Sequence, residues 1–193
     1  MQKKNVFAFS TALMIAAGLP LAAHASNSYT VDPPHTFAHF TINHLGFSTM
    51  HGRFDKSSGK ITLDTAAKTG TVDIAIESAS VDTGFAKRDE HLKSPDFFNA
   101  AEFPSITYKS NKIKFNGSKP ASIEGELTLL GVTKPVTLTV TEFNCGTNPM
   151  SKKDECGAGA TAHIKRSDFG MKAFLPNVGD DIKLEFEIEA YKD

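Results

Sequence analysis

The sequence predicts an all-β protein whose antiparallel sheet turns its apolar side inward. Apolar residues recur at every second position in segment after segment, most clearly over residues 70–79, 136–143 and 181–191. Successive side chains of a strand point to opposite faces, so each segment has one apolar face and one polar face. Many such segments with no long helix between them favour an antiparallel sheet that encloses either a filled core or a ligand.

Eight or nine strands are expected, joined mostly by connections of hairpin length. They are drawn, in chain order, from residues 29–32, 38–44, 52–54, 59–64, 70–79, 103–110, 113–115, 123–129, 136–143, 157–165 and 181–191. Pro33 and Pro34 end the first strand, and a turn is expected at Ser110 and Asn111. Residues 131–135 are interpreted as a turn, because Pro135 is tolerated only at the start or edge of a strand.

Residues 85–98 differ from the rest of the chain. The stretch 86–93 contains good helix formers and no β-branched residue, and Ser94 followed by Pro95 ends a helix. Phe97 and Phe98 come next. We expect a short helix that caps one end of a barrel, with the two phenylalanines at its mouth.

Residues 1–25 have the order of a secretory signal peptide. Lys3 and Lys4 precede an apolar run over residues 6–21, and small residues stand before the predicted cleavage site after Ala25. An uncleaved membrane anchor is disfavoured, because polar residues, glycine and proline interrupt the run. We therefore expect residues 26–193 to form a single exported domain that does not span the membrane.

The two cysteines and the charge narrow the function classes. Cys145 and Cys156 flank a polar stretch, and in an oxidising compartment they are expected to form a disulfide worth up to ~3 kcal/mol. Zinc is the alternative, but two thiolates without partner ligands make a poor site. The formal net charge is −1, and the chain has no basic patch of the kind that binds nucleic acid.

The histidines suggest a metal site only at first sight. His35 and His39 share a face if the second strand begins early, and His44, His51 and His91 are candidates to approach them. However, His39 and His44 have opposite parity, and no carboxylate follows at a ligand-like spacing. We predict no metal site, with His44 and His91 hydrogen-bonded in turns and at the mouth.

The segment 88–91 mixes a cation, acids and a base. Three interpretations stay open: helix-surface charge, an Arg88 or His91 that meets a ligand headgroup or phosphate, and an enzyme site. The enzyme would be a periplasmic hydrolase or isomerase that acts on an apolar substrate with Asp89 and His91 at the mouth. No motif for an activated nucleophile accompanies them, so we favour a protein that is not an enzyme.

A second charged turn covers residues 166–171. An ion pair between Arg166 and Asp168 is expected to stabilise this loop. Phe169, Met171 and Phe174 are expected to help close the barrel.

Several segments together carry a resemblance to a known family. They are Tyr29-Thr-Val-Asp32, His35, Phe40-Thr-Ile42-Asn-His44-Leu-Gly46, Gly52-Arg-Phe54, Ser80-Val-Asp-Thr-Gly84, Arg88-Asp-Glu-His-Leu-Lys-Ser-Pro-Asp-Phe-Phe98, Gly125-Glu-Leu-Thr-Leu-Leu-Gly131-Val-Thr-Lys-Pro-Val136 and Arg166-Ser-Asp-Phe-Gly170. They resemble the YceI family of secreted lipid-binding proteins over nearly all of residues 26–193. The resemblance implies a lipocalin-like, extended eight-stranded antiparallel β-barrel with one short helix capping an end. Its apolar tunnel would hold an isoprenoid lipid, either a polyprenyl lipid or a quinone tail, in the periplasm, and a homodimer is known in the family.

Barrel geometry agrees with this implication but does not require it. Eight strands enclose a space that side chains can fill or that can hold one small ligand. Small residues at inward positions leave room, although they also serve packing: Ala38, Gly125, Ala160, Ala162 and Ala190. An apolar chain binds by burial alone, at ~25 cal/mol per Å². Its site therefore needs no cofactor and leaves no polar motif.

The leading hypothesis is a periplasmic protein that holds an isoprenoid lipid for transport, storage or a stress-related role. A barrel with a filled core and a surface partner is a further alternative. The residues predicted to line the tunnel are Ala38, Phe40, Ile42, Val72, Ile74, Ile76, Ile106, Tyr108, Leu127, Leu129, Val136, Leu138, Phe186 and Ile188. Those predicted at the mouth are His44, Arg88, His91, Phe97 and Phe98.

Overall fold

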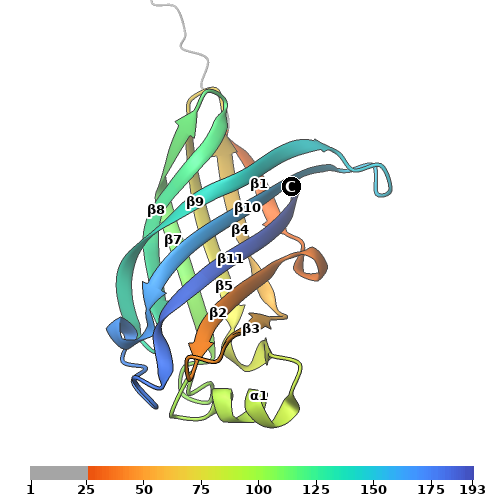
Figure 1. Cartoon of the computed structure of the whole chain (residues 1–193). Helices are drawn as coiled ribbons and strands as arrows, with labels where there is room; N and C mark the ends of the chain where they lie inside the picture. The colour runs from red at the N-terminus through yellow and green to blue at the C-terminus, as the bar shows by residue number, and fades with distance from the viewer. Residues whose placement is uncertain (1–25) are drawn as a thin grey trace, which may run out of the picture.

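One antiparallel sheet curls on itself in the computed structural model, which describes residues 26–193 (Figure 1). The predicted signal segment, residues 1–25, lies outside the described residues. The strands are β1 (Asn27–Val31), β2 (Phe37–His44), β3 (Ser48–Phe54), β4 (Ser57–Asp64), β5 (Thr69–Glu77), β6 (Val81–Asp82), β7 (Ser105–Asn116), β8 (Lys119–Leu129), β9 (Val132–Thr147), β10 (Asp154–Lys165) and β11 (Val178–Lys192). Three short 3₁₀ helices occupy Pro33–His35, Ser78–Ser80 and Arg166–Phe169, and one α-helix, α1, spans Ala86–Lys93.

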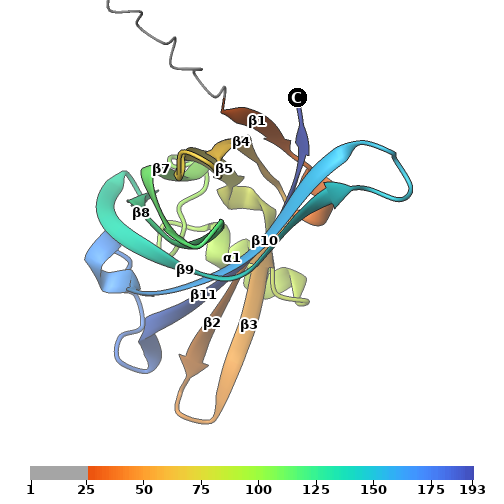
Figure 2. The ribbon, with the colours of Figure 1, turned by 90° about the horizontal axis from the view of Figure 1, so that it is seen from above.

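Eight of these strands close into a barrel. Neighbours pair in the order β1-β4-β5-β7-β8-β9-β10-β11, and β11 pairs back to β1. The predicted eight-stranded antiparallel barrel is therefore confirmed. β11 is long enough to pair twice along one edge, with β1 through Ala190 and with β2 through Phe186. The strands β2, β3 and β6 extend the wall beyond the closed ring at the end where α1 lies, and Figure 2 shows α1 beneath the barrel.

The break between β1 and β2 is explained by its sequence. Pro33 and Pro34 lack backbone donors and form a 3₁₀ helix instead of continuing the strand. The Thr36 side chain replaces the missing ladder contacts, since its Oγ1 donates to the Glu189 carbonyl at 3.2 Å and accepts from the Glu189 amide at 3.1 Å. Thr36 is only 2% exposed, so these bonds keep a buried hydroxyl paired.

One expected turn is wrong, and a second is shorter than expected, because the chain turns at Leu130 and Gly131 and residues 132–135 already belong to β9. β7 is continuous through Ser110 and Asn111, and its register shifts there as in a β-bulge. Ser110 Oγ holds the bulge by donating to the Glu124 carbonyl at 2.7 Å and accepting from the Lys112 amide at 3.0 Å. Pro135 lies inside β9, in a stretch that pairs with β8 before the pairing with β10 begins, so its missing donor leaves no ladder bond unmade.

The strand faces and the helix follow the sequence pattern. Val72, Ile74 and Ile76 on β5 are buried, while the alternate residues face outward. The helix ends at Lys93 with Ser94 as its C-cap, as the Ser-Pro sequence predicts. Within residues 26–193, no helix is both long enough and apolar enough to cross a lipid bilayer.

The predicted disulfide between Cys145 and Cys156 is present. The two cysteines are directly opposite each other on β9 and β10. This part of the β9–β10 hairpin projects from the barrel, on the side away from α1 (Figure 1). The bridge therefore joins two strands where the hairpin leaves the closed ring.

Candidate ligand-binding cavity

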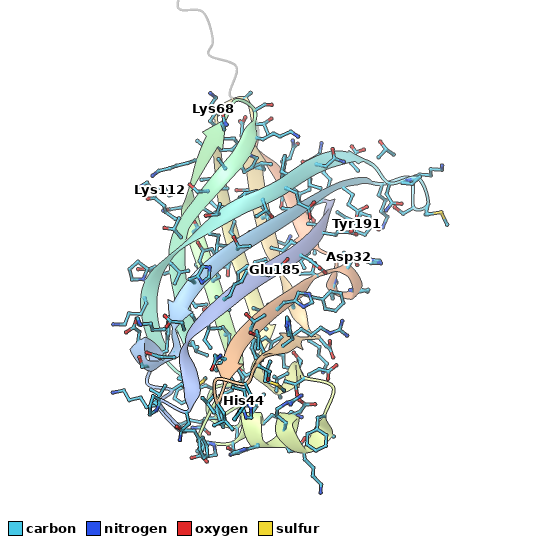
Figure 3. The ribbon with its side chains drawn as sticks, in the orientation of Figure 1. Asp32, His44, Lys68, Lys112, Glu185 and Tyr191 are labelled. Atoms are coloured by element: carbon cyan, nitrogen blue, oxygen red, sulfur yellow. A yellow bond between two sulfur atoms is a disulfide. The ribbon has the colours of Figure 1, made fainter. Side chains whose placement is uncertain are left out.

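A cavity of about 340 Å³ occupies the end of the barrel that α1 covers. We call its open end, where His44, Arg88 and His91 stand, the mouth. Figure 3 shows His44 at this end and Lys68 at the opposite end of the barrel. The wall is formed mainly by apolar side chains of β2, β3, β11 and the segment that follows α1. The volume lies within the range of ligand pockets.

A second cavity of about 110 Å³ continues further into the barrel and is lined almost entirely by apolar residues. The two cavities share four lining residues, which we call the waist: Ala38, Ile76, Leu127 and Phe186. They come from β2, β5, β8 and β11, so the waist encircles the interior. The cavities are therefore arranged in series, with the waist between them.

The structure brings together almost all of the predicted tunnel residues. Every one of them except Val136 lines one of the two cavities. Val136 is buried but borders neither cavity, and Tyr108 Oη donates to its carbonyl at 2.9 Å. Gly125, opposite Val136, makes room for this ring, because a Cβ there would meet Tyr108 Oη at 2.7 Å. Burial raises the pKa of Tyr108 to about 12.

The small inward residues have different roles. Ala38, Ala160 and Ala190 border cavity space, as expected. Gly125 admits a tyrosine ring instead, and Ala162 is packed in the core without bordering either cavity. Small size at an inward position therefore does not by itself indicate space for a ligand.

All five residues predicted at the mouth line the larger cavity. Phe97 and Phe98 are 8% and 9% exposed, so they point into the barrel as the sequence predicts. Phe98 meets Phe54 edge-on, with ring centres 5.1 Å apart. Phe97 stacks on Phe174 at 5.8 Å, and the His91 ring packs against both. This aromatic contact joins the helical segment to the loop before β11 across the mouth.

The charged residues of α1 separate into different contacts. Arg88 donates from Nε to Thr83 Oγ1 and from Nη2 to the Thr83 carbonyl, each at 2.7 Å. Asp89 accepts from the Thr83 amide at 2.9 Å, while His91 Nε2 lies 3.5 Å from the Asp96 carboxylate. Asp89 and His91 therefore contact different partners in this structure. Arg88, by contrast, lines the cavity with its guanidinium hydrogen-bonded to Thr83.

Arg166 forms a contact that differs from the prediction. Its guanidinium does not pair with Asp168; it donates to four backbone carbonyls, those of Gly179, Met171, Ala173 and Val178. Burial lowers the pKa of Arg166, which is 2% exposed. The loop over residues 171–179 wraps around this side chain and places Met171 and Phe174 at the cavity, as predicted, whereas Phe169 is a core residue.

Several cavity residues were missed by the sequence reasoning. Ile164, Ile182 and Leu184 continue the period-two pattern of β10 and β11, so a signal for them existed. Val178 begins β11 directly after the loop and carries no periodic signal. The cavity role of such residues can be identified only from the folded conformation of the loop.

Among the described residues, no carboxylate lines the larger cavity; its ionisable lining residues are His39, His44, His51, His91, Arg88 and Arg166. His39 Nε2 is 3.5 Å from Glu187 on the outer side, and His44 lies on the opposite face of β2, as its parity predicts. Basic groups with no acidic neighbour in the lining favour a ligand whose polar end is neutral or anionic.

His35 does not share a strand face with His39, because it belongs to the 3₁₀ helix before β2. Its Nδ1 lies 2.7 Å from the Asp32 carboxylate, and this hydrogen bond raises the pKa of His35. The fold brings Glu189 beside them, so that one ligand atom of each residue lies within 4.8 Å of the others. The absence of a metal site stays a prediction. Sequence spacing could not reveal this group of three residues, because Glu189 lies far from Asp32 and His35 in the chain.

The fold and the cavity define a class of protein. A closed antiparallel barrel with an apolar cavity open at one end is the architecture of lipocalin-like proteins, which hold a small ligand inside. Within this class, the chain belongs to the YceI-like family: the model of the YceI-like domain matches residues 29–190.

The relatives of the chain agree with this assignment. Protein YceI of Escherichia coli O157:H7 is 37% identical, and the match covers 97% of each chain. The crystal structure of the YCEI protein of Campylobacter jejuni matches with a TM-score of 0.67 at 30% identity, over 78% of this chain and 90% of that one. A polyisoprenoid binding domain from Saccharophagus degradans has the same fold, with a TM-score of 0.63 at 18% identity, over 86% of this chain and 98% of that one.

Proposed function

We propose that this protein binds an isoprenoid lipid, with the apolar chain in the two cavities and the polar headgroup at the mouth. The observation that carries the proposal is the series of two apolar cavities that begins at the mouth and passes the waist. A thin, flexible chain matches this shape better than a compact ligand. The name of the Saccharophagus degradans domain supports the isoprenoid class, and the ligand is a polyprenyl lipid or a quinone.

The chemistry of the lining supports binding without catalysis. Burial of an apolar chain contributes ~25 cal/mol per Å² of its surface and requires no hydrogen-bond partner. Arg88 and His91 stand where the headgroup would emerge, and Thr83 holds the guanidinium of Arg88 in place. These side chains donate hydrogen bonds to a phosphate or to a quinone carbonyl.

We further propose that the protein acts in the periplasm as a carrier or store. The disulfide between Cys145 and Cys156 supports an oxidising compartment, as does the predicted signal peptide. When the protein is secreted by its own leader, its intact mass should correspond to a chain that begins at Ser26. Sedimentation of the same sample measures whether it forms the homodimer that the family resemblance suggests.

The test is recovery of the ligand and competition for its space. Native mass spectrometry and organic extraction of the periplasmic protein should yield an isoprenoid, and emptied protein should take up a polyprenyl phosphate or a quinone. Ile42→Trp places a bulky ring in the larger cavity and should weaken uptake at least tenfold, because Ile42 lines it.

Thr41→Trp is the matched control, since Thr41 precedes Ile42 on β2 and points to the opposite face. It should take up the lipid as the wild type does. Both variants must first show the wild-type circular dichroism spectrum. Empty protein that takes up neither lipid, or equal uptake by the two tryptophan variants, would overturn the proposal.

A further inference from the structure

Exposed apolar side chains gather around the mouth. Among residues 26–193, the large apolar residues that are exposed are Leu45 (49%), Phe47 (90%), Phe85 (55%), Met150 (89%) and Phe174 (52%). All of them except Met150 lie in loops at the end where α1 stands (Figure 1). We call Leu45, Phe47, Phe85 and Phe174 the rim.

The three loops that carry the rim are connected around one opening. The Leu45 amide donates to the Asn177 carbonyl at 2.8 Å, which joins the β2–β3 hairpin to the loop before β11. Phe174 packs against His91 of α1 with ring centres 5.7 Å apart. Phe174 is also a lining residue of the larger cavity, so it extends the apolar surface of the rim into the interior, where Arg88 and His91 line the mouth as well.

The charges of these loops differ from those of the whole chain. The rim segments 43–51, 83–88 and 171–179 contain no aspartate or glutamate, whereas they carry Lys87, Arg88 and Lys172. The chain as a whole has a formal net charge of −1. Asp89, which follows the second segment, turns its carboxylate toward Thr83. The rim segments therefore combine exposed apolar groups with lysine side chains, while the exposed carboxylates of Glu90 and Asp96 lie on α1 and just after it.

Such a surface is complementary to an anionic lipid bilayer. Aromatic and aliphatic side chains insert at the boundary between headgroups and acyl chains, and lysine or arginine beside them is attracted to anionic lipids. Exposure of an apolar patch of this kind to water is unfavourable, and such patches commonly mark interaction sites that a partner covers. Its position at the opening of an apolar cavity is what identifies the partner as the bilayer.

We propose that the rim docks the mouth onto an anionic lipid bilayer, so that a lipid chain passes between membrane and cavity without crossing water. The inference rests on the proposed function, because docking serves transfer only if the cavity holds a lipid. Phe47 contributes most, being the most exposed of the rim residues and lying outside the cavity lining. Lys87 and Lys172 contribute the dependence on lipid charge.

The test is flotation of the full-length mature protein with vesicles of phosphatidylethanolamine and phosphatidylglycerol. The wild type should float with the vesicles, and Phe47→Ser should reduce the bound fraction about tenfold. Met150→Ser is the matched control, because Met150 is equally exposed at the tip of the β9–β10 hairpin, far from the mouth. It should bind vesicles as the wild type does.

Replacing Lys87 and Lys172 together by glutamine should remove the preference for vesicles that contain phosphatidylglycerol. Uptake of a polyprenyl phosphate from dilute solution, measured on the same samples, separates the two proposals, since Phe47→Ser should leave it unchanged. Uptake without flotation of the wild type would overturn docking alone, and failure of uptake would overturn the proposed function.

Equal losses for Phe47→Ser and Met150→Ser would overturn docking by the rim. A wild type that sediments as a dimer and becomes monomeric in Phe47→Ser, without binding vesicles, would assign the rim to a second copy of the chain and overturn the proposal as well.

Discussion

Replacing Arg166 by methionine tests whether one side chain holds the loop that closes the mouth. The Arg166 guanidinium donates to four carbonyls at 2.7 to 3.0 Å, all in residues 171–179. Methionine keeps much of the apolar stem but makes none of these bonds. The carbonyls that remain buried then have no hydrogen-bond donor, and an unsatisfied buried acceptor destabilises the fold by its full desolvation penalty.

The expected loss follows from these contacts. A hydrogen bond to a charged group contributes about 1.5 to 3 kcal/mol, but the four values do not add, because a surface loop can turn some carbonyls to water. Removing Arg166 also removes the cost of burying its charge. We therefore expect Arg166→Met to lower the free energy of unfolding by about 3 to 5 kcal/mol, as when one partner of a buried pair is removed. That is a large share of the 5 to 15 kcal/mol typical of a domain.

Equilibrium unfolding in urea measures this change, with a lower midpoint and an unchanged slope. Arg53→Met is the control: Arg53 Nε is 2.7 Å from the Asp55 carboxylate, but the side chain is 43% exposed, so its loss should stay below about 1 kcal/mol. A loose loop should also release a bound lipid faster. If Arg166→Met costs no more than Arg53→Met, the loop does not depend on this side chain and the reasoning is refuted.

Three further predictions concern the interior, the hairpin and the C-terminus. Ile74→Asp places an unpaired carboxylate at the second cavity and should abolish folding or lipid binding, which soluble yield and circular dichroism will show; a folded variant that keeps its lipid would contradict the assigned face. Replacing Cys145 and Cys156 together by serine should lower the free energy of unfolding by at most ~3 kcal/mol, since the bridge spans a sequence separation of 11; a larger loss in urea would mean that the hairpin stabilises more than itself. Hydrogen bonds from Ser28 and Thr30, with Lys60 beside them, hold the pKa of Asp193 at about 2, below its ordinary 3.8, so its contribution to stability is present above about pH 4 and is lost as the pH falls toward 2. The difference in urea midpoint between wild type and Asp193→Asn should accordingly shrink between about pH 4 and pH 2, and a constant difference would contradict this.

The strand faces could be predicted because they depend on neighbours in sequence. Val72, Ile74 and Ile76 are apolar at alternate positions, and a strand that buries one of them on an inner face must bury the others. The end of α1 at Ser94 is local for the same reason, because the residue before a proline leaves the helical region. These patterns identified both the wall of the barrel and its cap.

The errors came from contacts between distant segments. Ser110 and Asn111 have the composition of a turn, but a hydrogen bond to the Glu124 carbonyl keeps them in β7 as a bulge. Proximity in sequence predicts Asp168 as the partner of Arg166, whereas its partners in the structure are backbone carbonyls up to Gly179. Amino-acid composition does not determine which backbone carbonyl of a folded loop will accept a hydrogen bond from a given side chain.

The amino-acid sequence by itself determined the all-β class, the alternation of the strand faces, the short helix and the disulfide, since each follows from alternation, propensity or pairing within a short stretch. The eight-stranded barrel was implied by the family resemblance, because its closure joins β1 to β11 at opposite ends of the domain. Only the tertiary structure decided how the interior is divided. The waist joins Ala38, Ile76, Leu127 and Phe186 from four strands, and the space on either side is what their side chains leave unfilled. Empty volume depends on the positions of all the surrounding atoms at once, so it has no signature in any segment of the chain.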